Sequence, residues 1–224
     1  MKIMKKFFAF IMVICLMTFA LYVTAFAAET PADGTVLRVS ALKKDGTTVV
    51  LENSQNLVEG WNKAMNFAKN TSEMKKKNYD RIVVDLFTDW TAVNGEFADD
   101  SDGFNEGAIC IPAAARLTIN LNDNTINRGL AEWVYDGEVI YINDDADVII
   151  NKGTITGGWS ANGAGGIHVK DDVTLTLNDV HIVGNTADDD DGGGIALRDG
   201  AILVMNGGSF RDNRLIGADR KSVV

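Results

Sequence analysis

Apolar and polar residues alternate in the C-terminal part of the chain, in runs that repeat every 27 to 29 residues. Four of these runs align on an asparagine: LTINLNDNTINR, DVIINKGTITGG, LTLNDVHIVGN and LVMNGGSFRDN. The aligned asparagines lie 29, 27 and 28 residues apart: Asn122, Asn151, Asn178 and Asn206. A second set of residues lies 27 and 28 apart: Ile140, Ile167 and Ile195. Two landmarks that keep one period indicate a repeat architecture.

Each repeat unit holds three apolar runs of period two and no helical pattern, which predicts three strands per unit. On the first strand Leu117, Ile119 and Leu121 would face one way, and equivalent residues of later units match them. Stacked units would place these residues in ladders along a core that no single unit can close. The sequence therefore predicts an all-β fold, a right-handed parallel β-helix. An antiparallel sandwich is the alternative, but it gives no reason for asparagines to keep a fixed period.

The chain resembles the secreted β-helix repeat proteins of the pectate-lyase-like superfamily, especially bacterial surface proteins with GGGI…L…N…I..N repeats. The resemblance rests on Gly192–Leu197, Leu203–Asn213 and the spacing of Asn178, Ile182 and Asn185. It covers roughly the C-terminal two thirds of the chain. These motifs specify a coil and no particular activity.

Residues 1–27 have the pattern of a secretory signal peptide. Lys2, Lys5 and Lys6 precede a long apolar run, Phe7–Thr24, and Ala25–Ala27 supplies an A-x-A cleavage pattern. An uncleaved membrane anchor is the alternative, because the run approaches the ~20 residues that span a bilayer. We expect cleavage, and therefore a secreted or cell-surface protein that meets the membrane only through this segment during export.

Residues 28–80 are predicted to form an N-terminal β segment and one helix. The runs TVLRVSAL and TTVVLE flank Lys44–Gly46, which fits a hairpin turn. A helix is expected from about Gln55 to Lys77, because apolar residues follow at helical spacing: Leu57, Trp61, Ala64, Met65 and Ala68. The open end of a solenoid needs a lid over its core, so we expect this helix to cap the β-helix.

Residues 81–224 are predicted to form the β-helix itself. Arg81–Leu86 begins an irregular first coil, Gly107–Ile111 is its third strand, and the insert Asn94–Glu106 lies between them. Three regular coils and the beginning of a fifth follow, without a recognisable cap at Arg214–Val224. An uncapped end exposes apolar residues and strand edges. We therefore expect the natural chain to continue beyond Val224; an irregular block by the tail is the alternative.

The formal charge of −10 argues against a nucleic-acid partner. The acidic balance permits Ca²⁺ binding without requiring it, and no cofactor is expected. Cys110 remains as the single cysteine once residues 1–27 are removed, which excludes a disulfide framework in the mature chain. His168 and His181 fall on different strands at outward positions, so we expect surface histidines and no metal site.

The connection from the second to the third strand is the most variable part of each unit. A parallel β-helix would line these connections up along one edge, where loops commonly carry function. Aromatic rings stack on apolar sugar faces while polar groups bond the hydroxyls. The candidate ligand site on this edge comprises Trp133, Tyr135, Trp159, Asn162, Asp188, Asp189, Asp190 and Asp191.

Two alternatives apply to this edge. The tryptophans Trp133 and Trp159 could fold back over the strands, and the aspartates could simply be solvated. Asp188–Asp191 could also hold Ca²⁺, but four consecutive carboxylates usually cannot converge on one ion. A solvated acidic loop tip is favoured over a calcium site.

The sequence favours non-catalytic binding of a polysaccharide or another cell-surface component. The alternative is a polysaccharide lyase or glycoside hydrolase of the pectate-lyase-like fold, with its site partly in further C-terminal coils. For such enzymes the resemblance implies Ca²⁺-binding carboxylates with a basic proton acceptor, or aspartates with a Gly-His-Gly element. The chain has no Gly-His-Gly, and Lys170 and Arg211 are the main outward basic residues of the repeats. A passive stalk without a ligand is a third possibility, and no catalytic residue is assigned.

Overall fold

The computed structural model describes residues 31, 34–97, 107–188 and 192–216. The chain divides into two compact units, Met1–Pro31 and Ala32–Val224, and the fold below is that of the second unit. The predicted signal peptide lies outside the described residues. Within the described ranges, no helix is both long and apolar enough to cross a bilayer.

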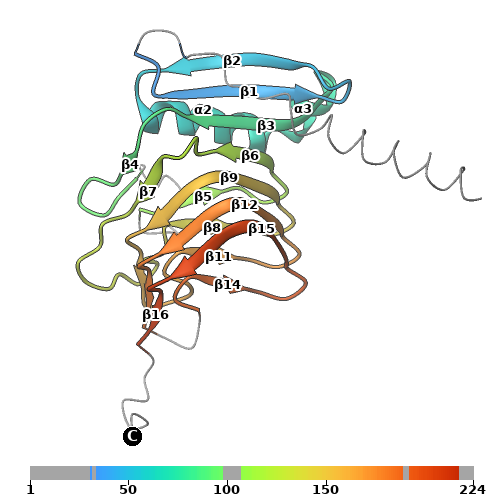
Figure 1. Cartoon of the computed structure of the whole chain (residues 1–224). Helices are drawn as coiled ribbons and strands as arrows, with labels where there is room; N and C mark the ends of the chain where they lie inside the picture. Colours follow the sequence, from blue (N-terminus) through green and yellow to red (C-terminus); the bar gives the residue numbers. More distant parts are fainter. Residues whose placement is uncertain (1–30, 32–33, 98–106, 189–191, 217–224) are drawn as a thin grey trace, which may run out of the picture. The chain divides into compact units, whose positions relative to one another are not determined.

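The second unit consists mainly of strands (Figure 1). The elements are, in chain order, β1 (Leu37–Lys43), β2 (Thr48–Ser54), α2 (Leu57–Lys69), α3 (Thr71–Lys76), β3 (Tyr79–Leu86), β4 (Trp90–Thr91), β5 (Ile109–Ile111), β6 (Arg116–Asn120), β7 (Thr125–Asn127), β8 (Ile140–Ile142), β9 (Asp147–Thr156), β10 (Trp159–Ser160), β11 (Ile167–Val169), β12 (Thr174–Val183), β13 (Thr186–Ala187), β14 (Ile195–Leu197), β15 (Ile202–Arg211) and β16 (Arg214–Leu215). They form a β-solenoid of about four turns.

The strands of successive turns stack into three sheets. The longest has the order β15-β12-β9-β6-β3-β1-β2, and the two others are β14-β11-β8-β5 and β10-β13-β16. In Figure 1, β6, β9, β12 and β15 follow one another down the stack. From β3 onward all pairings between these strands are parallel. The parallel solenoid predicted from the repeat is confirmed, and the antiparallel sandwich is excluded.

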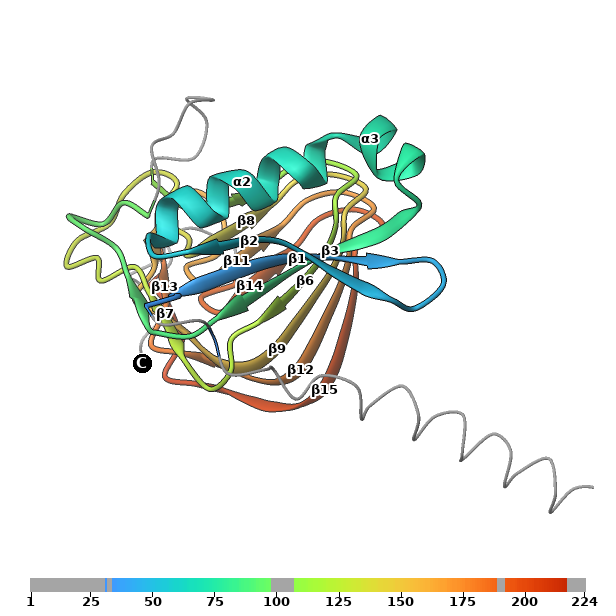
Figure 2. The ribbon, with the colours of Figure 1, turned by 90° about the horizontal axis from the view of Figure 1, so that it is seen from above.

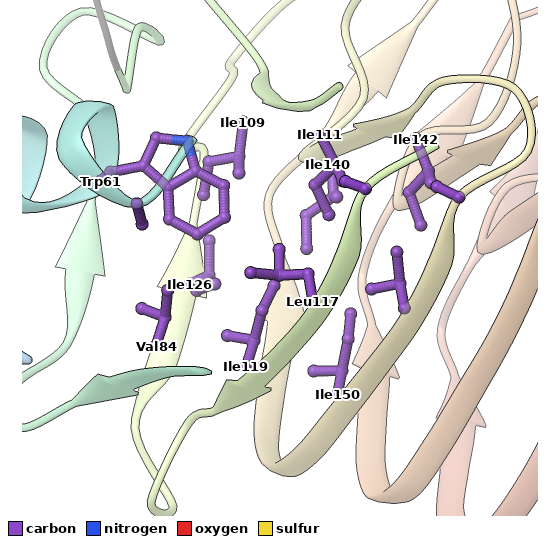
Figure 3. Close-up of a cluster of buried hydrophobic side chains, with 14 of the residues drawn as sticks. Trp61, Val84, Ile109, Ile111, Leu117, Ile119, Ile126, Ile140, Ile142 and Ile150 are labelled. Atoms are coloured by element: carbon purple, nitrogen blue, oxygen red, sulfur yellow. The ribbon is translucent and has the colours of Figure 1, made fainter. Parts of the chain in front are cut away.

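The apolar ladders predicted from the alternation are present. Leu117 of β6 pairs with Val148 of β9, which pairs with Leu175 of β12, and all three are fully buried. Figure 3 shows Ile140 and Ile142 of β8 pointing toward the inward side chains of β6 and β9. Each buried side chain of this size contributes about 1.5–3 kcal/mol relative to the exposed state. The core therefore lies between the two longer sheets.

A ladder of asparagine side chains runs along the outside of the longest sheet. Each amide donates from Nδ2 to Oδ1 of the asparagine one turn earlier, at 2.7, 2.7 and 2.9 Å. The members are Asn120, Asn151, Asn178 and Asn206. Asn120 in turn donates to Asp85 at 2.7 Å. The ladder satisfies side chains that the stacking brings together.

The predicted alignment is wrong at the first member of this ladder. Asn120, and not Asn122, pairs with Asn151. Asn122 and Asp123 have positive φ angles of 52° and 66° and form a turn between β6 and β7. This turn adds two residues to the coil, so Ile126 of β7 still pairs with Ile155 of β9. Asparagine and aspartate tolerate this left-handed conformation better than most residues.

The strands within a coil also differ from the prediction. The first two predicted strands are merged in β9, β12 and β15, each of ten residues. The connection predicted to be a variable loop contains a short regular strand, β10, β13 or β16. The third predicted strand is correct and corresponds to β5, β8, β11 and β14.

The N-terminal segment begins with the predicted hairpin. β1 and β2 pair antiparallel on either side of Lys44–Gly46, and β1 also pairs antiparallel with β3. The hairpin thereby extends the longest sheet beyond the first coil. The single helix expected from Gln55 to Lys77 is wrong, because the chain forms α2 and α3 with a break at Asn70. The Asn70 side chain accepts a hydrogen bond from Glu73 N at 3.0 Å, which caps α3.

One face of α2 is buried: Gly60, Trp61, Ala64, Met65 and Ala68. The ring of Trp61 lies edge-on to that of Trp90, with 5.8 Å between centroids, and Trp90 makes a similar contact with Phe97 at 5.4 Å. Figure 3 shows Trp61 beside Ile109 and Ile126 of the first coils. Viewed from above, α2 runs beside β1, β2 and β3 (Figure 2), which it contacts.

Candidate functional site

The smallest sheet brings three connections of the coils side by side. Trp159 of β10 pairs with Thr186 of β13, which pairs with Arg214 of β16. One turn earlier, Val134 forms a parallel bridge with Ser160 of β10. The segment around Val134 is therefore the rung next to β10. The predicted edge has a regular hydrogen-bonded backbone that the sequence did not indicate.

The two aromatic residues that flank Val134 are exposed. Trp133 is 56% exposed and Tyr135 is 58% exposed. Val134 between them is half-buried, and Ser160, which pairs with Val134, is fully buried. Trp159, on the outward row of the next rung, is half-buried. The structure therefore places the three rings on neighbouring rungs.

The polar candidates lie beside these rings. Asn162 Nδ2 donates to Asp136 Oδ1 at 3.2 Å, which connects the loop after β10 with the loop after Tyr135. Asp188 is half-buried, and its main-chain N–H donates to Ser160 O at 2.8 Å. Asp189, Asp190 and Asp191 lie outside the described residues. We call Trp133, Tyr135, Trp159, Asn162 and Asp188 the aromatic edge.

A carboxyl group that the sequence did not single out lies behind the aromatic edge. Glu138 is fully buried, and its Oε2 lies 3.4 Å from Ser160 Oγ. Burial, together with a smaller contribution from the charge of Asp136, raises the pKa of Glu138 to about 8, whereas Arg128 opposes the shift. Glu138 is therefore mostly protonated at neutral pH. In sequence it precedes an apolar strand, where an acidic residue usually indicates a solvated loop end.

Two buried polar atoms in this region have no hydrogen-bond partner among the described residues. They are Glu138 Oε1 and the indole nitrogen Nε1 of Trp159. Glu138 contacts Ser160, the residue after Trp159. Burying an unpaired polar group costs about 1–3 kcal/mol, so native proteins contain few of them. Such atoms are typical of places that accept a further polar group.

Arg128 fixes the backbone of the loop that carries Trp133 and Tyr135. Its side chain is 1% exposed. Nε donates to Gly95 O at 2.9 Å, and Nη1 donates to Asp136 O at 2.7 Å and to Glu138 O. A guanidinium group has five N–H donors and can therefore bind several carbonyl oxygens at once. Arg128 thus orders the loop without reaching the surface.

Ser160 connects the loop to β10. Its hydroxyl accepts from the main-chain N–H of Gly137 and of Asn162, both at 3.2 Å. Gly137 is required there, because a Cβ on this residue would lie 1.9 Å from Trp159 O. The aromatic edge therefore rests on a closely packed base in which backbone and buried side chains leave no space for a larger residue at position 137.

The outer face of the sheet β14-β11-β8-β5 carries His168, and here the expectation of a surface histidine is wrong. His168 is 4% exposed, its Nε2 accepts from Arg198 Nε at 3.2 Å, and its ring lies edge-on to Tyr141 at 5.1 Å.

Burial, followed by the charge of Glu138, raises the pKa of Tyr141 to about 12. Cys110, opposite Tyr141 in β5, is half-buried, and its sulfur lies 3.5 Å from Asn143 Nδ2.

His181 lies on the outside of the longest sheet. It is half-buried, and its Nδ1 is 2.9 Å from Ser209 Oγ of the next turn. The two histidines thus belong to different sheets, as expected. Within the described ranges, no three His, Cys, Asp or Glu residues are grouped so that they could hold a metal ion. The calcium hypothesis for Asp188–Asp191 falls mostly outside those ranges.

No protein-family model matches the chain, and neither a curated protein nor a solved structure matches it. The function is accordingly argued from the geometry of the aromatic edge and of the groups behind it. Fold alone does not specify an activity, whereas the residues of a site do.

Proposed function

We propose that this protein binds a glycan at the cell exterior through the aromatic edge. The observation that carries the proposal is the exposure of Trp133 and Tyr135 next to Trp159 on the following rung. Neighbouring rungs are about 4.8 Å apart, so rings on two rungs can cover successive apolar faces of a sugar chain. The amide of Asn162 and the carboxylate of Asp188 supply hydrogen bonds to hydroxyl groups.

The packing behind the edge supports the same proposal. Binding is tighter when the groups that contact the ligand are ordered beforehand, because less conformational entropy is lost. Arg128 and Ser160 hold the loop of Trp133 and Tyr135 through hydrogen bonds to its main chain. The rings are therefore carried by an ordered backbone and need only small side-chain adjustments.

The finer features of the fold are part of the proposal. We take the solenoid to be a right-handed parallel β-helix of the pectate-lyase-like type, since parallel connections are overwhelmingly right-handed. We take α2 to be the lid of its N-terminal end, supported by the burial of Trp61 against Trp90. Export by a signal peptide at residues 1–27 predicts a mature chain that begins at Ala28. N-terminal sequencing of the protein from culture medium tests this cleavage.

Affinity electrophoresis through gels that contain different polysaccharides tests glycan binding. The wild-type protein is expected to be retarded by at least one polysaccharide, and the double variant W133A/Y135A to lose this retardation. The control variant F87A also removes a partly exposed ring, one that Arg38 covers at 5.3 Å, and is expected to behave like the wild type. Migration of W133A/Y135A that equals the wild type would place the binding surface elsewhere.

A second candidate function is cleavage of the glycan as a polysaccharide lyase or glycoside hydrolase, and Glu138 is the observation that favours it. A carboxyl group that stays protonated at neutral pH is suited to act as a general acid. Because Glu138 is fully buried, this function requires the edge to open and admit the glycan. Incubation with the retained polysaccharide distinguishes the two functions. Cleavage predicts released oligosaccharides that disappear in E138Q while retention persists; binding alone predicts retention and no release.

A further inference from the structure

The aromatic edge carries negative charge. Glu132 and Asp136 flank the two exposed rings in sequence, and Asp188 lies two rungs from Val134. The segments 129–138, 157–166 and 184–188 contain no lysine or arginine. Arg128, which precedes the first segment, is buried and directs its donors at main-chain carbonyl groups. Arg214 lies two rungs beyond Trp159 in the stack.

The position of one of these carboxylates is determined. Asp136 accepts a hydrogen bond from Asn162 at 3.2 Å, so its charge stays next to the loop of Tyr135. Glu132 is exposed, and Asp188 is half-buried. The carboxylates therefore lie in the same segments as the rings or on a neighbouring rung.

Aromatic rings combined with carboxylates recognise cations. A cation within about 6 Å of a ring centroid is attracted by the ring's electron density, and Trp and Tyr are the strongest of these partners. A polyuronate would instead bring its own carboxylates next to Glu132, Asp136 and Asp188, and like charges repel. The charge of the edge thus distinguishes among glycans that the rings alone would accept.

We propose that the glycan bound at the aromatic edge carries free amino groups, as a polymer of glucosamine does. This inference rests on the proposed glycan binding and specifies its ligand class. An ammonium group contacts the faces of Trp133 and Tyr135, and the carboxylates of Glu132 and Asp136 neutralise it. The sugar ring stacks on Trp159.

Isothermal titration calorimetry with three oligosaccharides of equal length tests the inference. They are a fully deacetylated chito-oligosaccharide, its N-acetylated form and an oligogalacturonate, at a pH where the amine is protonated. The deacetylated form is expected to bind about 10-fold more tightly than the N-acetylated form, and its affinity is expected to fall as salt is raised. The variant E132Q/D136N is expected to lose about 2- to 5-fold in affinity per removed charge.

The variant D171N is the matched control, because it removes one charge from an exposed aspartate on the turn between β11 and β12. It is expected to bind as the wild type does. Equal or tighter binding of the N-acetylated form or of the oligogalacturonate overturns the inference and leaves glycan binding in place. If none of the three binds and no polysaccharide retards the protein, both the inference and the proposed function fail.

Discussion

Two pairs of tryptophans occupy contrasting regions of this protein. Trp61 and Trp90, in the N-terminal cluster, are each 3% exposed and contact each other edge-on. Trp133 and Trp159 lie on adjacent rungs of the aromatic edge, where Trp133 is 56% exposed. The first pair is part of the buried core cluster, whereas the second is attached to the outside of a regular stack. Whether a tryptophan is buried or exposed therefore depends on its surroundings and not on its residue type.

The backbone around the two pairs explains the difference. Trp61 lies on the buried face of α2, so its neighbours are apolar side chains of the first coils. Trp133 lies on a loop fixed through its main chain by Arg128 and Ser160, which leaves its side chain unused by the fold. Substitution of Trp61 should therefore lower the unfolding free energy, whereas substitution of Trp133 should lower the affinity for the glycan.

The largest expected effect is that of Trp61→Ala. Removing a buried tryptophan costs about 3–5 kcal/mol, because transfer energy is lost and a cavity remains. Urea unfolding followed by circular dichroism measures the loss of unfolding free energy. A loss of less than about 1 kcal/mol would show that α2 contributes little to the solenoid, and the contrast between the two pairs would disappear.

Gly137→Ala should have a smaller effect on stability and a large effect on glycan binding at the aromatic edge. The added Cβ would meet Trp159 O at 1.9 Å, so the loop has to move, at a typical cost of about 1–3 kcal/mol. We expect glycan retardation to be lost while the near-ultraviolet dichroism of Trp61 and Trp90 is kept. Gly46→Ala is the control: its φ of 86° also strains an added Cβ, but nothing lies within 4 Å of that Cβ, and Gly46 lies in the hairpin turn, which the edge does not use. Retained binding in G137A would argue against an ordered edge.

Glu138 should make stability depend on pH. Its pKa is about 8 in the folded protein against 4.5 in the unfolded chain. Between these values the folded state holds a proton that the unfolded state has lost, so the stability that Glu138 contributes falls as the pH rises. The slope is at most about 1.4 kcal/mol per pH unit.

Denaturant unfolding of E138Q and of the wild type across this pH range measures the effect. The difference in unfolding free energy should move in favour of E138Q as the pH rises from 4.5 toward 8. E132Q, which replaces an exposed glutamate, should follow the wild type. Parallel curves for E138Q and wild type would show that the carboxyl group is not buried.

The smallest expected effect on stability is that of Trp133→Ala. Exposed side chains outside the core usually change the unfolding free energy by no more than about 0.5 kcal/mol. Removing a ring that contacts a ligand should nevertheless reduce glycan affinity about 10-fold. Calorimetry of binding and urea unfolding, made on the same preparation, separate the two effects. A destabilisation as large as that of Trp61→Ala would show that Trp133 packs against the fold.

The period of the sequence predicts the stacking correctly because each coil must return to the same place. Ile140, Ile167 and Ile195 lie opposite one another as the 27- and 28-residue spacings require. The error at Asn122 has a physical cause: the turn of positive φ before β7 inserts two residues. The spacing of aligned residues along the sequence does not reveal this insertion. Ile126, which follows the turn, keeps its predicted alignment.

The candidate site could be predicted only in its outward residues. Trp133 and Tyr135 could be placed on an exposed connection because that part of each unit is variable, which is a local feature of the sequence. The burial of Glu138 depends on contacts with Ser160 and Arg128, which are 22 and 10 residues away. These hydrogen bonds join unlike residues and, in contrast to those of the asparagine ladder, leave no periodic pattern in the sequence. For the same reason the burial of His168 beside Arg198 was missed.

The indole N–H signals of the protein distinguish the exposed tryptophans from the buried ones, because each of the four tryptophans reports on one of the two regions. An NMR titration with the deacetylated chito-oligosaccharide follows all four signals at once. We expect the signals of Trp133 and Trp159 to shift with saturation while those of Trp61 and Trp90 stay in place. Shifts confined to Trp61 and Trp90, or a saturable binding isotherm with no indole shift, would contradict this expectation.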